Sequence, residues 1–111
     1  MSVQITRLAT SLIAASATAY YTVATDTRTR IDAMTLTNTD TSTRTVSVYL
    51  VASGGSPGAS NIILSNASIA PGATLRVKEA FGQVLHSGAK IYAAASVASV
   101  VNIYASGVEV T

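Results

Sequence analysis

Threonine recurs at every second position from residue 35 to residue 45, with apolar residues at the alternate positions on both sides of the run. Those apolar residues are Met34 and Leu36 before the polar stretch and Val46, Val48 and Leu50 after it. Only an extended strand sends alternate residues to opposite faces. The pattern therefore predicts two strands, Ile31–Thr37 and Thr45–Ala52, paired as a β-hairpin about Asn38–Thr43, with one apolar and one hydroxyl-rich face.

Similar short alternating patterns recur along the rest of the chain and are separated by turn-forming residues at intervals of about ten positions. They predict further strands at residues 3–7, 11–15, 20–24, 61–70, 74–77, 90–97 and 101–110. Many short strands with regular turn signals are typical of a β-sandwich or barrel. We expect an all-β fold, an antiparallel β-sandwich of seven to nine short strands that is Ig-like or jelly-roll-like.

Several positions allow more local predictions. Pro71 and Gly72 occupy the second and third positions that a type II turn requires. Residues 79–86 have helix-like spacing but contain a glycine, which favours a single turn over a longer helix. Gly107 predicts a bulge in the last strand. Asp32 falls on the apolar face of its strand, and we expect an ion pair with Arg30 or Arg44.

The low charge of the chain is the most informative feature of its composition. Asp, Glu, Lys and Arg make up 11% of the 111 residues, against about 25% in an ordinary soluble domain. Hydrophobic residues make up 49%, and the mean hydropathy is +0.43. So few charges give little repulsion between copies. The composition predicts hydroxyl-rich exposed faces together with a large protein–protein interface, and a homo-oligomer such as a dimer or trimer.

The sequence offers little for catalysis. Cysteine is absent, which excludes disulfides and thiolate chemistry, and His86 is the single histidine. The carboxylates are spread along the chain and form no close pair: Asp26, Asp32, Asp40, Glu79 and Glu109. No phosphate-binding glycine motif is present. We therefore predict a protein that is not an enzyme, with no cofactor and no metal site.

The charge pattern also argues against nucleic acid and membranes as partners. The net charge is +2, and the seven basic residues are scattered along the chain. Arg28 and Arg30 lie two positions apart. These two residues are interpreted as solvated loop or interface charges. The apolar run Leu8–Ala19 is too short and too polar to span a bilayer, and we interpret it as a buried strand.

Two segments carry a family resemblance. They are IDAMTLTNTDTSTRTVSVYLVASGGSPGASNIILSNASIAPGATL, residues 31–75, and GQVLHSGAKIYAAASVASVVNIYASGVEV, residues 82–110. The order of the hydroxyl-rich hairpin, glycine-rich loop, Pro-Gly turn and closing strand resembles small bacteriophage virion proteins of β-sandwich type. The region from residue 31 onward that contains the resemblance makes up about three-quarters of the chain and includes no catalytic residue. It implies a virion structural protein bound to the major capsid protein or another virion protein.

The resemblance divides the chain at residue 30. Residues 31–111 would form the β-sandwich core, and residues 1–30 would be an N-terminal arm with the first strands, a possible docking segment. The candidate partner-binding residues are Ile5, Leu8, Leu12, Tyr20, Tyr21, Arg28 and Arg30.

The expected function is that of a capsid decoration (cement) protein, located on the capsid surface of the virion, that bridges neighbouring capsomers. The alternative is a neck, tail or fibre adhesin module that binds host glycan or receptor through the loop Ser53–Ser60 and the tyrosines.

Overall fold

The computed structural model describes residues 2–111. Nine strands and one short helix follow each other along this part of the chain. The strands are β1 (Val3–Leu12), β2 (Thr18–Thr22), β3 (Arg28–Asn38), β4 (Arg44–Val51), β5 (Ile62–Ile69), β6 (Thr74–Arg76), β7 (Val84–Leu85), β8 (Lys90–Ala95) and β9 (Val101–Val110). The helix, η1 (Lys78–Ala80), is a single 3₁₀ turn.

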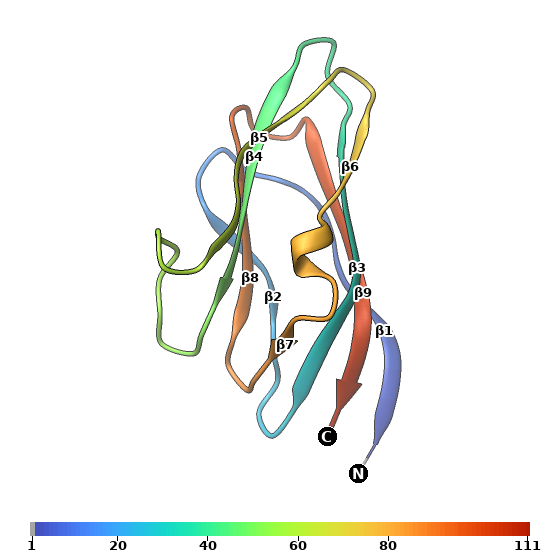
Figure 1. Cartoon of the computed structure of the whole chain (residues 1–111), viewed down its shortest axis with the longest axis vertical. Coiled ribbons are helices and arrows are strands. Elements are labelled where there is room, and N and C mark those ends of the chain that lie inside the picture. Colours follow the sequence, from blue (N-terminus) through green and yellow to red (C-terminus); the bar gives the residue numbers. More distant parts are fainter. Residues whose placement is uncertain (1) are drawn as a thin grey trace.

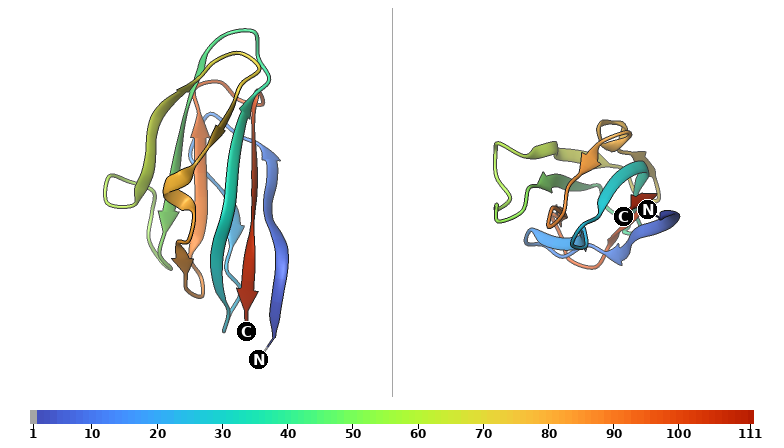
Figure 2. Two further views of the ribbon diagram at one scale, coloured as in Figure 1. Left: turned by 45° about the vertical axis from the view of Figure 1, so that its right-hand side comes forward. Right: turned by 90° about the horizontal axis from the view of Figure 1, so that it is seen from below.

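The strands form two antiparallel sheets that pack face to face (Figure 1). Sheet A has the order β1-β9-β3-β6, and β7 pairs with β3. Sheet B has the order β2-β8-β4-β5. The end-on view in Figure 2 shows the two layers and places β1 at the margin of its layer. The all-β antiparallel sandwich predicted from the sequence is confirmed, with nine strands in the described residues.

The core lies between the sheets and follows the alternation of the strands. Met34 and Leu36 of β3 and Ile103 of β9 are fully buried, while Val46 and Val48 of β4 meet them from sheet B. Small residues of β8 share this interior, among them Ala93 and Ala95. Their small side chains let the two sheets approach closely.

The predicted hairpin between residues 31 and 52 is wrong in its pairing and right in its faces. β3 belongs to sheet A and β4 to sheet B, and they are not hydrogen-bonded to each other. β3 pairs instead with β9, β6 and β7, and β4 pairs with β5 and β8. Residues 39–43 therefore cross from one sheet to the other. Alternation fixes which side chains face the core, but it does not fix which strand lies alongside.

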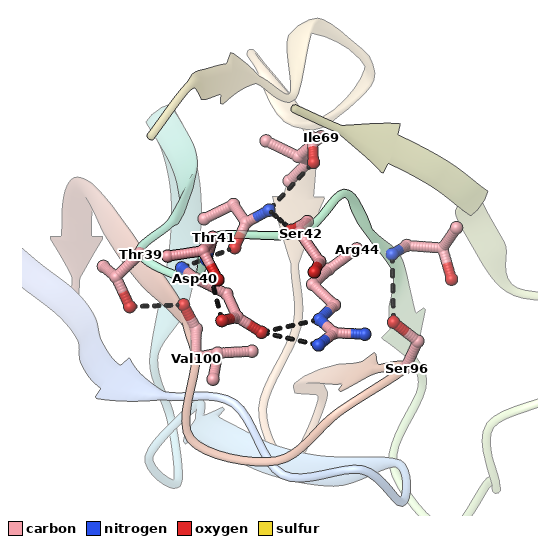
Figure 3. A network of polar contacts seen from close by, with 10 residues as sticks. Thr39, Asp40, Thr41, Ser42, Arg44, Ile69, Ser96 and Val100 are labelled. Carbon is pink, nitrogen blue, oxygen red and sulfur yellow. Dashed lines mark hydrogen bonds and ion pairs between the residues drawn. The ribbon is translucent and has the colours of Figure 1, made fainter. Parts of the chain in front are cut away.

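A polar network holds this crossing (Figure 3). The Asn38 side-chain amide donates to the carbonyl oxygens of Ser42 and Ile69, at 2.9 Å each, and its oxygen accepts from the Asp40 amide. Arg44 forms an ion pair with Asp40 at 2.7 Å. Hydrogen bonding from Arg44 lowers the pKa of the Asp40 carboxyl below its ordinary value. A buried side chain thus replaces the hairpin turn that the sequence suggested.

The local predictions have mixed outcomes. The type II turn at Pro71-Gly72 is confirmed, because Gly72 has φ 73° and the Ala73 amide bonds the Ala70 carbonyl at 3.0 Å. The single helical turn is confirmed as η1. The bulge predicted at Gly107 lies instead in the two neighbouring strands, where Leu8 of β1 and Asp32 of β3 are the extra residues.

Gly107 nevertheless explains why the bulges occur there. Its inner side has no room for a side chain: a Cβ would collide with the Arg30 carbonyl oxygen and lie 3.1 Å from Leu8 Cδ1. The bulge in β3 also moves Asp32 off the apolar, core-facing side of the strand. On the exposed side, Asp32 forms an ion pair with Arg30 at 2.8 Å, one of the two expected partners. Gly107 therefore sets the register of β9 against its two neighbours, β1 and β3.

The described residues of the N-terminal segment are built into both sheets. β1 pairs with β9 over most of its length, and β2 pairs with β8. Leu8, Ile13 and Val23 belong to the same hydrophobic core as residues beyond position 31. Residues 2–30 therefore share one core with the rest of the sandwich.

Candidate protein-binding face

The outer face of sheet A, the side turned away from sheet B, gathers the exposed apolar side chains of the molecule. Six large hydrophobic residues are exposed in residues 2–111, and five of them lie on this face by the register of the strands. These five are Val3, Ile5 and Leu12 of β1, Val84 of β7 and Tyr104 of β9. Ile5 is 88% exposed. Aliphatic side chains concentrated on one side of a small protein are typical of an interaction surface.

The same face carries an excess of positive charge. Arg7, Arg28, Arg30 and Arg76 all lie on it, since their strand partners are outward-facing residues. Arg30 is paired with Asp32. Within the described chain, the other three arginines have no carboxylate within ion-pair distance. The face is therefore both apolar and basic, and three of its four arginines lack a counter-charge within the described residues.

Two shallow hollows shape this face. The first has a volume of about 480 Å³ and lies over small residues at the centre of the sheet. Its lining residues are Ile5, Thr6, Arg7, Ala33, Thr35, Tyr104, Ala105 and Ser106. The second, about 300 Å³, lies lower on the sheet and is lined by Arg28, Thr29, Arg30, Val84, Val108 and Val110. Both are open depressions of a kind that a partner's side chains can fill.

The outer face of sheet B is covered more fully by its own chain. Ser47 faces outward from β4 but is buried, because a bulge in β5 places Asn66 over it. The Asn66 amide donates to the Ser47 hydroxyl at 2.9 Å. At the end of β4, Gly55 of the glycine-rich loop packs against Val51. Asn61 closes that loop by bonding the Ser56 carbonyl and the Gly58 amide, each at 2.9 Å.

The structure divides the seven predicted partner-binding residues. It brings four of them together on the outer face of sheet A: Ile5, Leu12, Arg28 and Arg30. Leu8 is 7% exposed and belongs to the core. Tyr20 packs against the core, and its hydroxyl accepts a hydrogen bond from the Ala14 amide at 2.7 Å. These contacts keep Leu8 and Tyr20 off the exposed face of sheet A. The hydrogen bonds of the Tyr21 hydroxyl to Glu109 and Thr29 keep Tyr21 off that face as well.

Tyr21 lies between the sheets and joins them. Its hydroxyl donates to the Glu109 carboxylate at 2.5 Å and lies 2.6 Å from the Thr29 hydroxyl. Both partners come from sheet A, whereas Tyr21 comes from sheet B. Burial, together with the hydrogen bond to Glu109, raises the pKa of Tyr21 to about 12. This residue therefore stabilises the contact between the sheets.

No cluster of three or more possible metal ligands occurs in residues 2–111. His86 is exposed in a loop, beside a hollow that Asp26, Thr27, Arg28 and Ser87 also line. Across the same residues, no helix is long and apolar enough to cross a membrane.

Several residues of the exposed face were missed from the sequence. Val108 and Val110 continue the outward alternation of Tyr104 beyond Gly107, so the sequence pattern of β9 could have identified them. Val84 lies in a two-residue strand that is too short to show a pattern. Arg7 and Arg76 join the face only because β1 and β6 flank β9 and β3, which local sequence does not reveal.

No protein-family model matches the chain, and neither a curated protein nor a solved structure shows significant similarity to it. Its function is therefore inferred from its own sequence and surface.

Proposed function

We propose that this protein is a non-enzymatic structural component that binds another protein through the outer face of sheet A. The observation that carries the proposal is the collection of exposed aliphatic side chains on that face, with arginines between them. An ordinary stable interface buries about 800 Å² on each partner. Apolar burial contributes roughly 25 cal/mol per Å², so such a contact can supply substantial binding free energy.

The proposed setting is a bacteriophage virion, with the protein on the capsid surface as a decoration (cement) protein that bridges neighbouring capsomers. This more specific part rests on the sequence resemblance of residues 31–75 and 82–110. A shell offers many equivalent sites, and a dimer or trimer engages several at once. Multivalency then makes a modest affinity at one site effectively permanent.

Virion labelling tests this function. Virions of the phage that encodes the protein are purified and probed with an antibody against the protein, using immunogold labelling and electron microscopy. The decoration role predicts gold over the whole head and cosedimentation of added protein with particles stripped of it. Labelling confined to the tail, or no labelling, contradicts the decoration role.

A second candidate function is an adhesin module of the neck, tail or fibre. One observation favours it: Tyr49 and Tyr92 are direct cross-strand partners on the outer face of sheet B. Tyr49 helps to line a hollow of about 270 Å³, together with the polar residues Thr45, Ser47, Asn66 and Ser96 and three alanines. Paired aromatic rings beside polar groups suit sugar binding. Competition of the soluble protein with phage adsorption to cells would support this role, and Tyr92→Ala should then abolish the competition.

A further inference from the structure

β1 is the edge strand of sheet A, and its outer edge is open. In the described part of the chain, β1 pairs with one strand, β9, along one of its edges, and no strand pairs with its other edge. The strand runs for ten residues, longer than most edge strands, and contains neither proline nor glycine. An open edge of this length presents a row of backbone donors and acceptors to which another strand can bond.

The hydrogen-bond pattern identifies which residues present those groups. Ser2 and Thr111 exchange both backbone hydrogen bonds, at 3.3 and 2.9 Å. Bonded and non-bonded pairs alternate along an antiparallel ladder. Gln4 and Thr6 therefore bond to β9, whereas the amide and carbonyl groups of Val3, Ile5 and Arg7 point to the open edge. One of these carbonyls, that of Arg7, has only a long contact of 3.5 Å with the Thr6 hydroxyl.

The side chains of the same three residues lie on the exposed face of sheet A. Val3 and Ile5 are exposed aliphatic residues, and Arg7 forms no ion pair within residues 2–111. We propose that this edge accepts a strand from the partner protein, with an apolar side chain opposite Ile5 and an acidic side chain beside Arg7. This inference rests on the proposed function and specifies the chemistry of its partner.

Charge complementarity selects this occupant over two others. A second copy of β1 brings another arginine and no carboxylate, because the strand sequence VQITRLATSL contains no acidic residue. Nucleic acid offers phosphate acceptors for Arg7, but it cannot supply the regular amide donors that the carbonyls of Val3 and Ile5 require. A protein strand that carries an apolar residue and an acidic residue two positions apart, on the same face, satisfies the backbone groups, the aliphatic side chains and the charge.

The test uses two blocked heptapeptides, Thr-Val-Thr-Glu-Thr-Val-Thr and its counterpart with lysine in place of glutamate, in which the valines and the charged residue share one face of the strand. Each is titrated into the ¹⁵N-labelled full chain, and amide shifts are followed by NMR. We expect the acidic peptide to shift the amides of residues 3–7 and to bind at least ten-fold more tightly than the lysine peptide. Equal binding of the two peptides, or no shift at residues 3–7, overturns the proposal.

Three variants sharpen the test. Ile5→Pro removes an amide that points to the open edge, so the sheet should persist while peptide binding is lost. Thr6→Pro removes an amide that bonds to β9, so it should destabilise the protein. Arg7→Glu should reverse the preference between the peptides. Retained binding by folded Ile5→Pro protein contradicts strand addition. So does binding of a DNA duplex at the same residues, or self-association that Ile5→Pro abolishes.

Particle binding separates this inference from the proposed function. If wild-type protein cosediments with particles and Ile5→Pro and Arg7→Glu do so equally, the function stands and the strand-addition inference fails. If the peptide results hold but wild-type protein does not bind particles, the decoration role fails and the edge remains a strand acceptor.

Discussion

The two sheets of this sandwich differ in how their outer faces are covered. Sheet B folds part of its own chain over itself: the β5 bulge buries Ser47, and the glycine-rich loop packs on Val51. Sheet A leaves aliphatic and arginine side chains exposed over β1, β9 and β3. These three strands lie side by side in Figure 2. Burial is thus completed within the chain on the outer face of sheet B and is left incomplete on that of sheet A.

The largest effect is expected at Gly107, which sets the register of β9 against β1 and β3. Gly107→Ala places a Cβ against the Arg30 carbonyl oxygen and forces the central strands apart. We expect a loss of more than about 3 kcal/mol of unfolding free energy, or failure to fold. Urea denaturation measures it. Gly58→Ala is the matched control, because a Cβ there meets nothing within 4 Å, and it should change stability little. Near-neutral Gly107→Ala would contradict the packing described for the bulges.

The next largest effect compares the two sides of sheet A. Ile103 faces the core and is fully buried, whereas Ile5 is almost fully exposed. Ile103→Ala should cost about 2–5 kcal/mol of unfolding free energy, and Ile5→Ala should change it by less than about 0.5 kcal/mol. Both are measured by thermal or urea unfolding. If Ile5→Ala proved as destabilising as a core substitution, Ile5 would have to be buried within the folded protein itself.

A smaller effect tests the covering of sheet B. Ser47→Ala removes the hydroxyl that accepts from the Asn66 amide and leaves that amide without this partner. The expected loss is about 1–2 kcal/mol. Thr35→Ala is the counterpart on the outer face of sheet A, where we expect a change within about 0.5 kcal/mol. Equal losses of unfolding free energy in the two variants would show that the outer faces of the two sheets are covered alike.

The smallest effect concerns the contact between the sheets at Tyr21. Tyr21→Phe should lower the unfolding free energy by about 1 kcal/mol at pH 8, because the phenol no longer bonds Glu109 and Thr29. The pKa of Tyr21 is raised from 10.0 to about 12 in the folded chain. The folded state thus keeps the proton longer, so the stabilisation is full below pH 10 and declines between pH 10 and 12. Urea unfolding at pH 8, 10 and 11.5 should show the difference between wild type and variant shrinking. A difference that stays constant or grows with pH would contradict this role of the phenol.

Much of the fold could be predicted from the sequence, because alternation is a local property of the strands. The inward positions of Met34, Leu36, Val46 and Val48 and the turn at Pro71-Gly72 followed directly from the pattern. The partners of the strands did not follow. Whether β3 meets β4 or β9 depends on contacts far apart in the chain, and the Asn38 network that carries the chain between the sheets has no short signature.

The candidate site was predicted in part for the same reason. Ile5 and Leu12 are exposed apolar residues of a strand that alternation could identify, and Arg28 and Arg30 were recognised as surface charges. Leu8 lies off the exposed face of sheet A because the bulge in β1 turns it toward the core. The unpaired state of Arg7 and its closeness to Tyr104 depend on the order of strands in sheet A.

We propose that the protein binds its partner protein through the outer face of sheet A and not through the outer face of sheet B. Cosedimentation of purified protein with particles stripped of it tests this claim most directly, using wild type, Ile5→Asp on sheet A and Ser68→Asp on sheet B. Both substituted residues are exposed, so both variants should fold. The account predicts that Ile5→Asp lowers particle binding at least ten-fold while Ser68→Asp binds like wild type. Undiminished binding by Ile5→Asp, together with loss in Ser68→Asp, would contradict it.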